Sequence, residues 1–215
     1  MQQTKSNVRV MAEVPFRYER GDLLTYRFLA EIRCDPPTAF QLGFPVFGSD
    51  PTFDRSKAKG LVATLITLNE KYHAKSTALE ISAGAKLYNV VMENKQVGKE
   101  LLQHGKLKKR VTNIPLNKTN AFRASAQKLT AAKKIGGEKV NLALSLVGYE
   151  EKVANAMTFV FGDTLICDDS NTAKAVTFNS AVGLKSVTLD GDVYDPSGTL
   201  SGGSAPSSSG LLVKV

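Results

Sequence analysis

The most informative part of this sequence is VTLDGDVYDPSGTLSGGS, residues 187–204. Its first part, within residues 186–195, has the β-branched and turn residues of a strand pair. Four glycines follow one another within thirteen residues, at Gly191, Gly198, Gly202 and Gly203. Because glycine has no Cβ, it accepts positive φ and lets another backbone approach closely. The stretch is therefore either a pair of ordinary turns or a surface shaped to receive another chain.

Strand-like and helix-like segments alternate upstream of this stretch. We expect strands at 61–68, 87–92, 106–116, 143–149 and 164–168, and helices at 78–85, 95–105, 125–135, 150–162 and 170–178. Asn94 stands at a capping position before the second helix, and Gly105 is a natural stop after it. The alternation predicts a mixed α/β fold of two lobes, each a small sheet with flanking helices.

The lobes define the expected domain organisation. We expect residues 44–135 to form lobe one with a connecting helix, and residues 136–204 to form lobe two. Residues 1–43 contain three prolines and read as an uncertain leader with a short helix at 22–32. Residues 205–215 begin with a serine-rich, glycine-containing segment typical of a flexible exit.

The charge of the chain is concentrated in its middle. The formal net charge is +8 over 215 residues, yet residues 95–140 hold twelve basic and only two acidic side chains. This asymmetry favours a polyanionic partner, although a solvated basic face is the plain alternative. We expect DNA binding through phosphates, without sequence readout. The candidate residues are Lys106, Lys108, Lys109, Arg110, Lys118 and Arg123.

Catalytic constellations are hard to assemble from this sequence. His73 and His104 are the two histidines, and both are placed where structural roles suffice. Cys34 and Cys167 are far apart, which argues against a disulfide framework or a C-x-x-C metal site and favours a reducing compartment. We expect no catalytic residue, no metal and no cofactor, in a soluble intracellular protein without a signal peptide or membrane span.

Phosphate-binding motifs are also missing. Neither G-x-x-x-x-G-K-[ST] nor G-x-G-x-x-G at a strand-helix junction occurs. The LSGGS peptide at 200–204 looks like the signature peptide of ABC-type ATPases, but without a phosphate loop it does not predict ATP hydrolysis. The paired acids Asp168 and Asp169 precede a helix start, where acids satisfy free amides. The chain alone is not expected to be an enzyme.

Several blocks together resemble the hinge domain of SMC proteins, the chromosome-organising ATPases, and most closely the hinge of condensin's second SMC subunit. The glycine spacing G-x6-G-x3-G-G is similar to the hinge motif. The matching blocks run in the family's order from about residue 44 to 203: AKGLVATL at 58–65, TALEISAGAKLYNVV at 77–91, KLKKRVTNIPLNK at 106–118, ALSLVGYEEKVANAMTFVFGDTLICDD at 143–169 and TLDGDVYDPSGTLSGGS at 188–204. Ala85, Asn113 and Thr119 depart from the family pattern.

The resemblance implies a dimerisation module that pairs with the hinge of the other condensin SMC subunit in chromosome condensation during mitosis, with the ATPase head and coiled-coil arms outside this chain. It implies a nuclear and chromosomal location, with the cytoplasm also possible. A small-molecule or nucleotide-binding α/β domain unrelated to chromosomes is the alternative. The dimer interface that the resemblance implies consists of Leu87, Tyr88, Asn89, Val90, Val91, Gly191, Gly198, Gly202 and Gly203.

Overall fold

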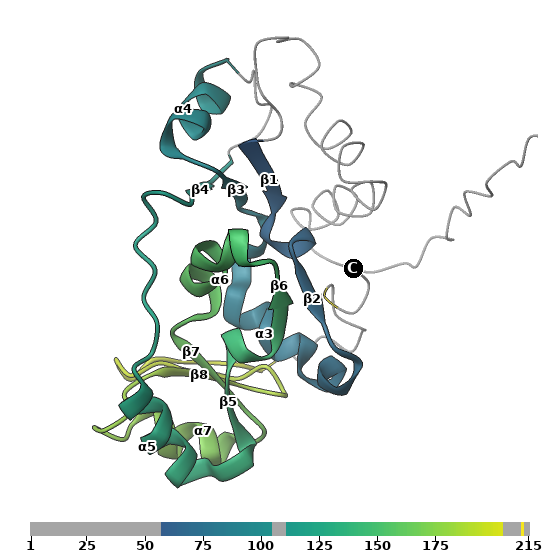
Figure 1. The fold of residues 1–215 in the computed structure, drawn as a ribbon. Helices are drawn as coiled ribbons and strands as arrows, with labels where there is room; N and C mark the ends of the chain where they lie inside the picture. Colours follow the sequence, from purple (N-terminus) through teal and green to yellow (C-terminus); the bar gives the residue numbers. More distant parts are fainter. Residues whose placement is uncertain (1–56, 105–110, 204–211, 213–215) are drawn as a thin grey trace, which may run out of the picture. The chain divides into compact units, whose positions relative to one another are not determined.

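The computed structural model describes residues 57–104, 111–203 and 212 of the chain (Figure 1). They belong to one compact unit that spans Phe44–Val215. The expected leader, residues 1–43, lies outside the described residues, as does the expected exit apart from Leu212. The fold is mixed α/β, with small sheets and flanking helices, as the sequence predicts.

The first sheet has three strands in the order β1-β3-β4. Strand β1 (Ala58–Leu61) runs antiparallel to β3 (Val90–Met92), and β4 (Asn113–Pro115) runs parallel to β3 on its other side. Helix α4 (Lys95–His104) makes the crossover from β3 to β4. The expected cap is confirmed, because Asn94 Oδ1 accepts a hydrogen bond from the Val97 amide at 3.0 Å.

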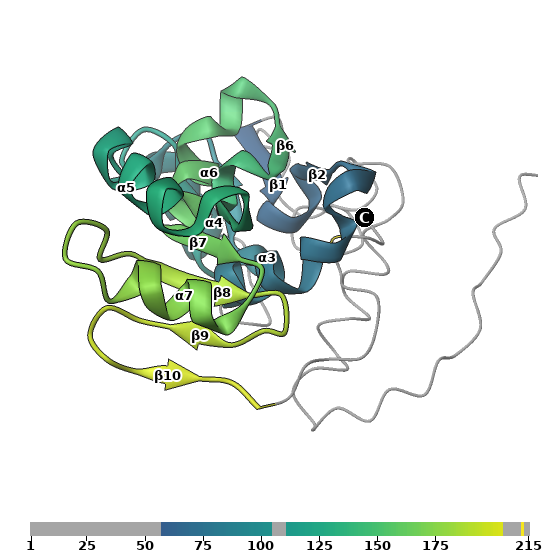
Figure 2. The ribbon, with the colours of Figure 1, turned by 90° about the horizontal axis from the view of Figure 1, so that it is seen from below.

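The second sheet has five strands in the order β10-β9-β8-β7-β5. Its members are β5 (Val140–Leu142), β7 (Thr164–Cys167), β8 (Lys185–Thr188), β9 (Val193–Tyr194) and β10 (Leu200–Ser201). Strands β7 and β8 are parallel, joined by helix α7 (Ser170–Thr177), whereas the other neighbours are antiparallel. Figure 2 shows β8, β9 and β10 side by side, with β10 at the outer edge.

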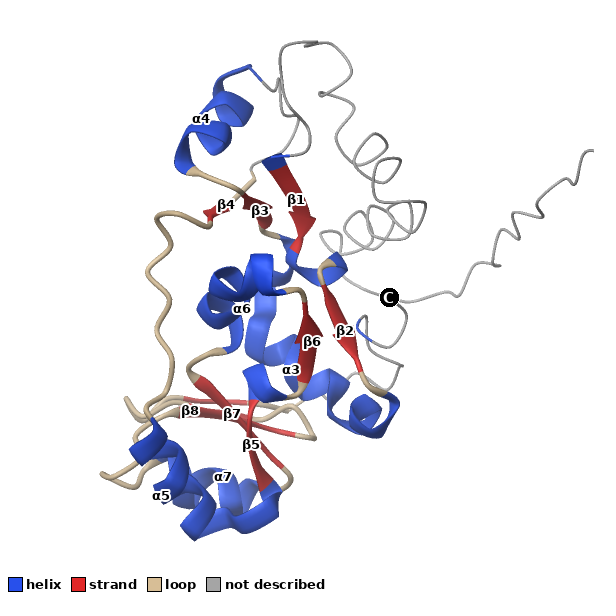
Figure 3. Cartoon of the chain, in the orientation of Figure 1, coloured by secondary structure: helices blue, strands red, loops and turns tan. Residues whose placement is uncertain are grey.

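A two-stranded ladder joins the two halves. Strand β2 (Ile66–Leu68) pairs antiparallel with β6 (Val147–Tyr149), and Thr67 lies opposite Gly148. Short 3-10 segments flank these strands: η3 (Val62–Thr64), η4 (Glu70–Lys75), η5 (Gly84–Tyr88), η6 (Gly137–Lys139), η7 (Ala143–Ser145) and η8 (Glu151–Val153). Figure 3 places the ladder between the two sheets.

The remaining helices cover the sheets and interlock the halves. Helix α5 (Ala126–Gly136) packs on α7 and β5. Helix α3 (Ser76–Ala83) comes from the first half but contacts β7 and β8 of the second sheet. Helix α6 (Ala154–Phe161) comes from the second half, yet its Asn155 Nδ2 donates to the carbonyls of Leu116 and Thr119 in the first half. The halves therefore share one core.

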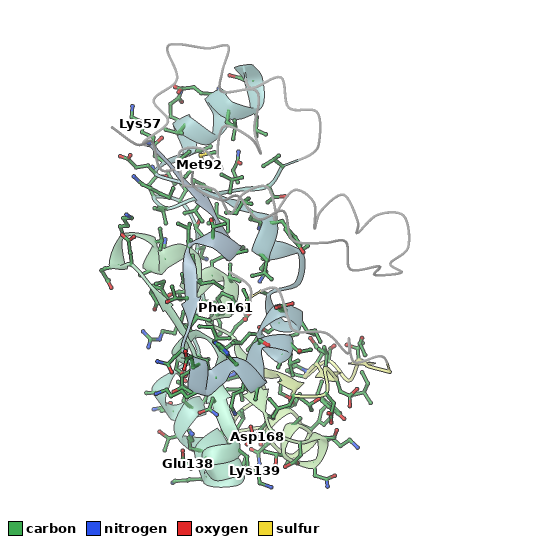
Figure 4. All side chains as sticks on the ribbon, turned by 90° about the vertical axis from the view of Figure 1, so that its right-hand side faces the viewer. Lys57, Met92, Glu138, Lys139, Phe161 and Asp168 are labelled. Carbon is green, nitrogen blue, oxygen red and sulfur yellow. The ribbon has the colours of Figure 1, made fainter. Side chains whose placement is uncertain are left out.

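The two halves repeat the same topology. The order strand, 3-10, strand, 3-10, helix, strand, helix, strand runs from β1 to β4 and again from β5 to β8, except that the first half has an additional 3-10 segment, η5, between α3 and β3. Local bonds repeat as well: Thr64 Oγ1 donates to the Leu61 carbonyl, and Ser145 Oγ to the Leu142 carbonyl. Figure 4 places Lys57 and Met92 near one end of the unit and Lys139 and Asp168 near the other, with Phe161 between them. The Glu93 amide donates to the Lys57 carbonyl, as the Asp168 amide does to that of Lys139.

Three strand predictions need correction. The expected strand at 61–68 is divided by η3 into β1 and β2, and the expected strand at 143–149 contains η7 before β6. In both places a hydroxyl three residues after a leucine bonds back to that leucine's carbonyl, which bends the chain from one sheet into the central ladder. The expected strand at 87–92 is η5 followed by the shorter β3.

The N-terminus of α7 gives a pH-dependent contribution to stability. Asp169 caps this helix: its Oδ1 accepts from the Thr172 amide at 2.8 Å, and Lys139 Nζ lies 3.1 Å from Oδ2. The hydrogen bond from the Thr172 amide, together with the hydrogen bond from Lys139, lowers the pKa of the Asp169 carboxyl from 3.8 to about 2. Since the folded pKa lies below the unfolded value, this stabilisation is complete above pH 4 and is lost as the pH falls toward 2.

We expect the Asp169→Asn variant, which retains a capping oxygen without the charge, to be less pH-sensitive than the wild type. The urea midpoint of the variant should lie furthest below that of the wild type at pH 5, and the difference between the two midpoints should shrink between pH 4 and pH 2. Urea denaturation at four pH values measures this, with Asp190→Asn at an exposed position as the matched control. A difference between wild type and Asp169→Asn that does not change over this range would contradict the linkage.

Candidate dimerisation surface

The two sheets end in strands whose peptide groups face outward. Strand β10 ends the five-stranded sheet and β4 ends the three-stranded one. An unpaired strand edge carries a row of N–H and C=O groups that can pair with another chain. Strands β5 and β1 form the opposite edges of these sheets. We take β10 and β4 as the candidate edges because β10 lies in the glycine-rich stretch 187–204 and β4 is the parallel neighbour of β3 in the predicted interface segment 87–91.

On β10, the outward peptide groups belong to Leu200. The Asp195 amide bonds to the Thr199 carbonyl, and partners alternate along an antiparallel ladder, so Thr199 and Ser201 face β9 while Leu200 faces away. Leu200 is 61% exposed, so its side chain is available for contact with another chain.

The predicted glycines surround β10 and have different roles. Gly198, at φ +95°, completes the turn from β9 to β10, where its amide bonds to the Asp195 carbonyl. Gly203, at φ +114°, follows β10, and a Cβ there would meet open space. A Cβ on Gly202 would collide with the Asp192 carboxylate, and one on Gly191 would press on Ile81 of α3. Gly191 and Gly202 thus serve packing within the chain, whereas Gly198 and Gly203 lie beside the open edge.

The other predicted interface segment, residues 87–91, has no open strand edge in this structure. Strand β3 is paired on both sides, with β1 and β4, and Val90 and Val91 are fully buried. Leu87 is also buried, and with Tyr88 it lies in η5, which ends before Asn89. These residues therefore offer no open strand edge, because a fully apolar strand takes the centre of a sheet, and their part in the interface stays a prediction.

On the first sheet the open edge belongs to β4 and was missed from the sequence. The Val90 amide bonds to the Thr112 carbonyl and the Leu116 amide to the Met92 carbonyl, so the peptide groups of Asn113 face outward. The neighbouring Pro115 has no N–H, and its carbonyl already accepts from the Lys118 and Thr119 amides. Asn113 is therefore the residue of β4 whose backbone can accept and donate across this edge.

The predicted DNA-binding residues are only partly within the described structure. Lys106, Lys108, Lys109 and Arg110 lie outside it. Lys118 and Arg123 are exposed on the segment that leads from β4 to α5, and this segment also exposes Phe122. The structure thus describes two of the six predicted cations, and both are exposed.

Groups that could support catalysis are sparse among residues 57–104, 111–203 and 212. No cluster of three His, Cys, Asp or Glu side chains there could hold a metal ion. Cys167 is buried in β7, and burial raises the pKa of its thiol to about 12, which keeps it protonated and unreactive. His73 lies in η4. A pocket of about 440 Å³ lies beside β2 and β6, and Lys71 Nζ stands 4.7 Å from the Tyr72 ring centroid in its lining.

Membrane insertion finds no support in the described part of the chain. None of its helices combines the length and the apolar composition that crossing a bilayer requires.

The class of protein to which this chain belongs follows from its similarity to a known family. The family model of the SMC proteins flexible hinge domain matches residues 55–177. The chain belongs to the SMC hinge family.

Individual relatives with high identity share the name structural maintenance of chromosomes protein 2. The chain is 59% identical over 165 residues to structural maintenance of chromosomes protein 2 of Schizosaccharomyces pombe, and 43% identical over 174 residues to the human protein of that name. These matches cover 77% and 80% of this chain, but only 14% of each relative.

Solved structures have the same fold. The Geobacillus stearothermophilus SMC hinge domain, crystallised as an asymmetric dimer, matches with a TM-score of 0.66 at 24% identity over 90% of this chain and 78% of that one. The Pyrococcus furiosus Smc hinge domain with an extended coiled coil matches with a TM-score of 0.60 at 25% identity over 85% of this chain and 59% of that one.

Proposed function

We propose that this chain is the dimerisation hinge of a condensin-type SMC protein and that it pairs with the hinge of the other condensin SMC subunit, in the nucleus and on chromosomes. The observation that carries the proposal is the pair of open edges, β4 and β10, with the exposed Leu200 on one and the outward backbone of Asn113 on the other. We further propose that residues 44–135 and 136–204 act as its two lobes.

The geometry supports one mode of joining, in which β4 of each chain pairs with β10 of the other. In the joined sheet, the crossover β3-α4-β4 of one chain leads to the strand nearer the joint, and so does the crossover β7-α7-β8 of the other chain. The two crossovers approach the joint from opposite sides. Because such crossovers are right-handed, the two helices lie on the same face of the joined sheet only if β4 and the partner's β10 run antiparallel. Three strands of one chain and five of the other would then form one continuous sheet.

The side chains agree with this arrangement. Asn113 faces α4, since its Nδ2 donates to the Gly98 carbonyl at 3.2 Å. Leu200 lies opposite Tyr194, which lies opposite Ser186, and Ser186 Oγ donates to the Ala173 carbonyl of α7. Residues directly opposite in a ladder share a face, so Leu200 faces the α7 side. Pairing Asn113 with Leu200 of the partner therefore places both side chains on the helix-covered face.

Mass measurement tests the proposal. Sedimentation of the chain alone, of the other condensin hinge alone and of the mixture should give a one-to-one complex in the mixture. A mixture that sediments as two separate monomers at every concentration would rule out this partner. Catalytic turnover of a small molecule by the chain alone would instead support the alternative, a small-molecule or nucleotide-binding domain.

A second function, DNA binding, is favoured by the twelve basic residues between positions 95 and 140. We propose phosphate contacts by Lys106, Lys108, Lys109 and Arg110, supported by Lys118 and Arg123. Replacing the first four by glutamate should remove most of the affinity and should reduce the salt slope of log affinity by about 3 to 4, since each phosphate contact releases counterions. Random sequences should bind alike.

Fluorescence anisotropy with single-stranded and double-stranded oligonucleotides over a salt series measures this. Replacement of Lys128, Lys133, Lys134 and Lys139 by glutamate is the matched control, because it changes the net charge by the same amount elsewhere. Equal losses in both variants would indicate a general charge effect and would reject the first cluster as the site.

A further inference from the structure

We propose that α4 and β4 form a docking slot, defined by Lys99, Leu102 and Asn113, for the apolar side chain that another SMC hinge carries on its edge strand at the position of Leu200. The inference rests on the proposed dimerisation and names the residues of this chain that would recognise the incoming strand. It comes from the internal repeat, because the second half of the molecule shows the equivalent place already filled.

The equivalence of the two places is set by matching contacts. Asn94 caps α4 through the Val97 amide, as Asp169 caps α7 through the Thr172 amide. Counting from these caps, Gly98 of α4 corresponds to Ala173 of α7. Both carbonyls accept a hydrogen bond from the strand that follows: Gly98 from Asn113 and Ala173 from Ser186.

In the second half, strand β9 contacts α7 and pairs with the edge of β8. Tyr194, opposite Ser186, is only 6% exposed and packs under α7, with Lys174 Nζ 5.9 Å from its ring centroid. Thr177 is 1% exposed, and its hydroxyl is hydrogen-bonded to that of Ser186. The aromatic side chain of an antiparallel strand therefore closes this place within the chain.

In the first half, the corresponding residues are Lys99, Leu102 and Asn113, and within the described structure no β9 equivalent follows β4. Leu102 takes the place of Thr177 but is 57% exposed. Asn113 takes the place of Ser186, and its buried Oδ1 finds no hydrogen-bond partner among the described residues.

The slot therefore has an apolar wall, a lysine stem and an open strand edge, whereas in the second half the corresponding edge of β8 is paired with β9 and Tyr194 fills the place. An antiparallel strand added at β4 would put the residue opposite Asn113 where Tyr194 lies in the other half. On β10 the residue with outward peptide groups on the helix-covered face is Leu200. An aliphatic side chain against Leu102 and the stem of Lys99 would remove exposed apolar surface on both chains.

A fluorescent label at the slot tests the inference. In a Cys34→Ser background, Leu102→Cys is labelled with an environment-sensitive fluorophore and titrated with the other condensin hinge, while the mass of the complex is followed in the same samples. Cys167 is buried and stays unlabelled in the folded chain. We expect a blue shift at position 102 upon complex formation and none at a Phe122→Cys control, whose position is 60% exposed on the segment after β4.

A substitution separates recognition from folding. Leu102→Thr supplies the hydroxyl that Thr177 gives in the other half, so we expect unchanged or higher stability of the monomer together with about tenfold weaker pairing. A complex that forms with no shift at position 102, or with full affinity for Leu102→Thr, would overturn the slot and leave the dimerisation in place. Absence of any complex in the mass measurement would overturn the proposed dimerisation and the slot with it.

Discussion

Replacing Leu200 by glutamate is expected to weaken pairing with the other condensin hinge at least about 100-fold, because burying a carboxylate in place of an apolar side chain at the joint between the two chains costs several kcal/mol and each 1.4 kcal/mol is a factor of ten. The free chain should fold normally, since the Leu200 side chain is already 61% exposed. Sedimentation of a titration series gives the dissociation constant, and circular dichroism checks the fold.

The control is Ile135→Glu, which introduces the same charge at another exposed aliphatic residue. Ile135 is 40% exposed on α5, and α5 packs on β5 at the opposite end of the sheet from β10. This variant should pair like the wild type. If Leu200→Glu and Ile135→Glu retain equal affinity, the β10 edge is not the interface.

Leu200 is a sharper probe than the glycines that the sequence singles out. Gly198 and Gly203 adopt positive φ, so any side chain there strains the backbone whether or not a partner binds. A Cβ on Gly202 would collide with Asp192 inside the same chain. Loss of pairing in a glycine variant would therefore mix damage to the turn with damage to the interface.

Much of the fold could be predicted from hydrophobic patterning and capping. The helices expected at 95–105, 125–135 and 170–178 correspond to α4, α5 and α7, and the strand expected at 164–168 corresponds to β7. The bends at η3 and η7 could not, because LVATLITL and ALSLVGY are continuous apolar runs that local propensity assigns to single strands. The bends are fixed by the pairing of β2 with β6, a contact between residues about eighty positions apart.

The candidate site was predictable in part for a similar reason. Glycine spacing pointed to the β9-β10 region, where turn chemistry is local and readable from sequence. Which strand ends a sheet depends on topology, however, and Asn113 stood out only as a departure from the family pattern. The run LYNVV carried a usable signal, since an apolar strand is typical of a sheet centre rather than an edge. The internal repeat is visible mainly in contacts, such as those of Thr64 and Ser145, because few residues are shared between the halves.

The interlocked halves lead to a second large expected effect, on stability. Phe161 lies in α6, is fully buried, and is located between the two ends of the unit in Figure 4. Phe161→Ala is expected to lower the free energy of unfolding by about 3–5 kcal/mol, since it removes a large buried side chain and leaves a cavity. A domain typically has only about 5–15 kcal/mol in total, so the denaturation midpoint should shift strongly.

The shape of the unfolding curve carries the further argument. Helix α3 of the first half packs on the second sheet, while Asn155 of α6 bonds to the first half, so the unfolding of either half would remove contacts that stabilise the other. We therefore expect one cooperative transition in wild type and one in Phe161→Ala, shifted as a whole, with coincident far-ultraviolet and fluorescence signals in urea. Phe122→Ala, at a position 60% exposed, should change the free energy by less than about 0.5 kcal/mol. Two separated transitions in the variant, with only one displaced, would show that the lobes fold independently and that the shared core between α3 and α6 contributes little.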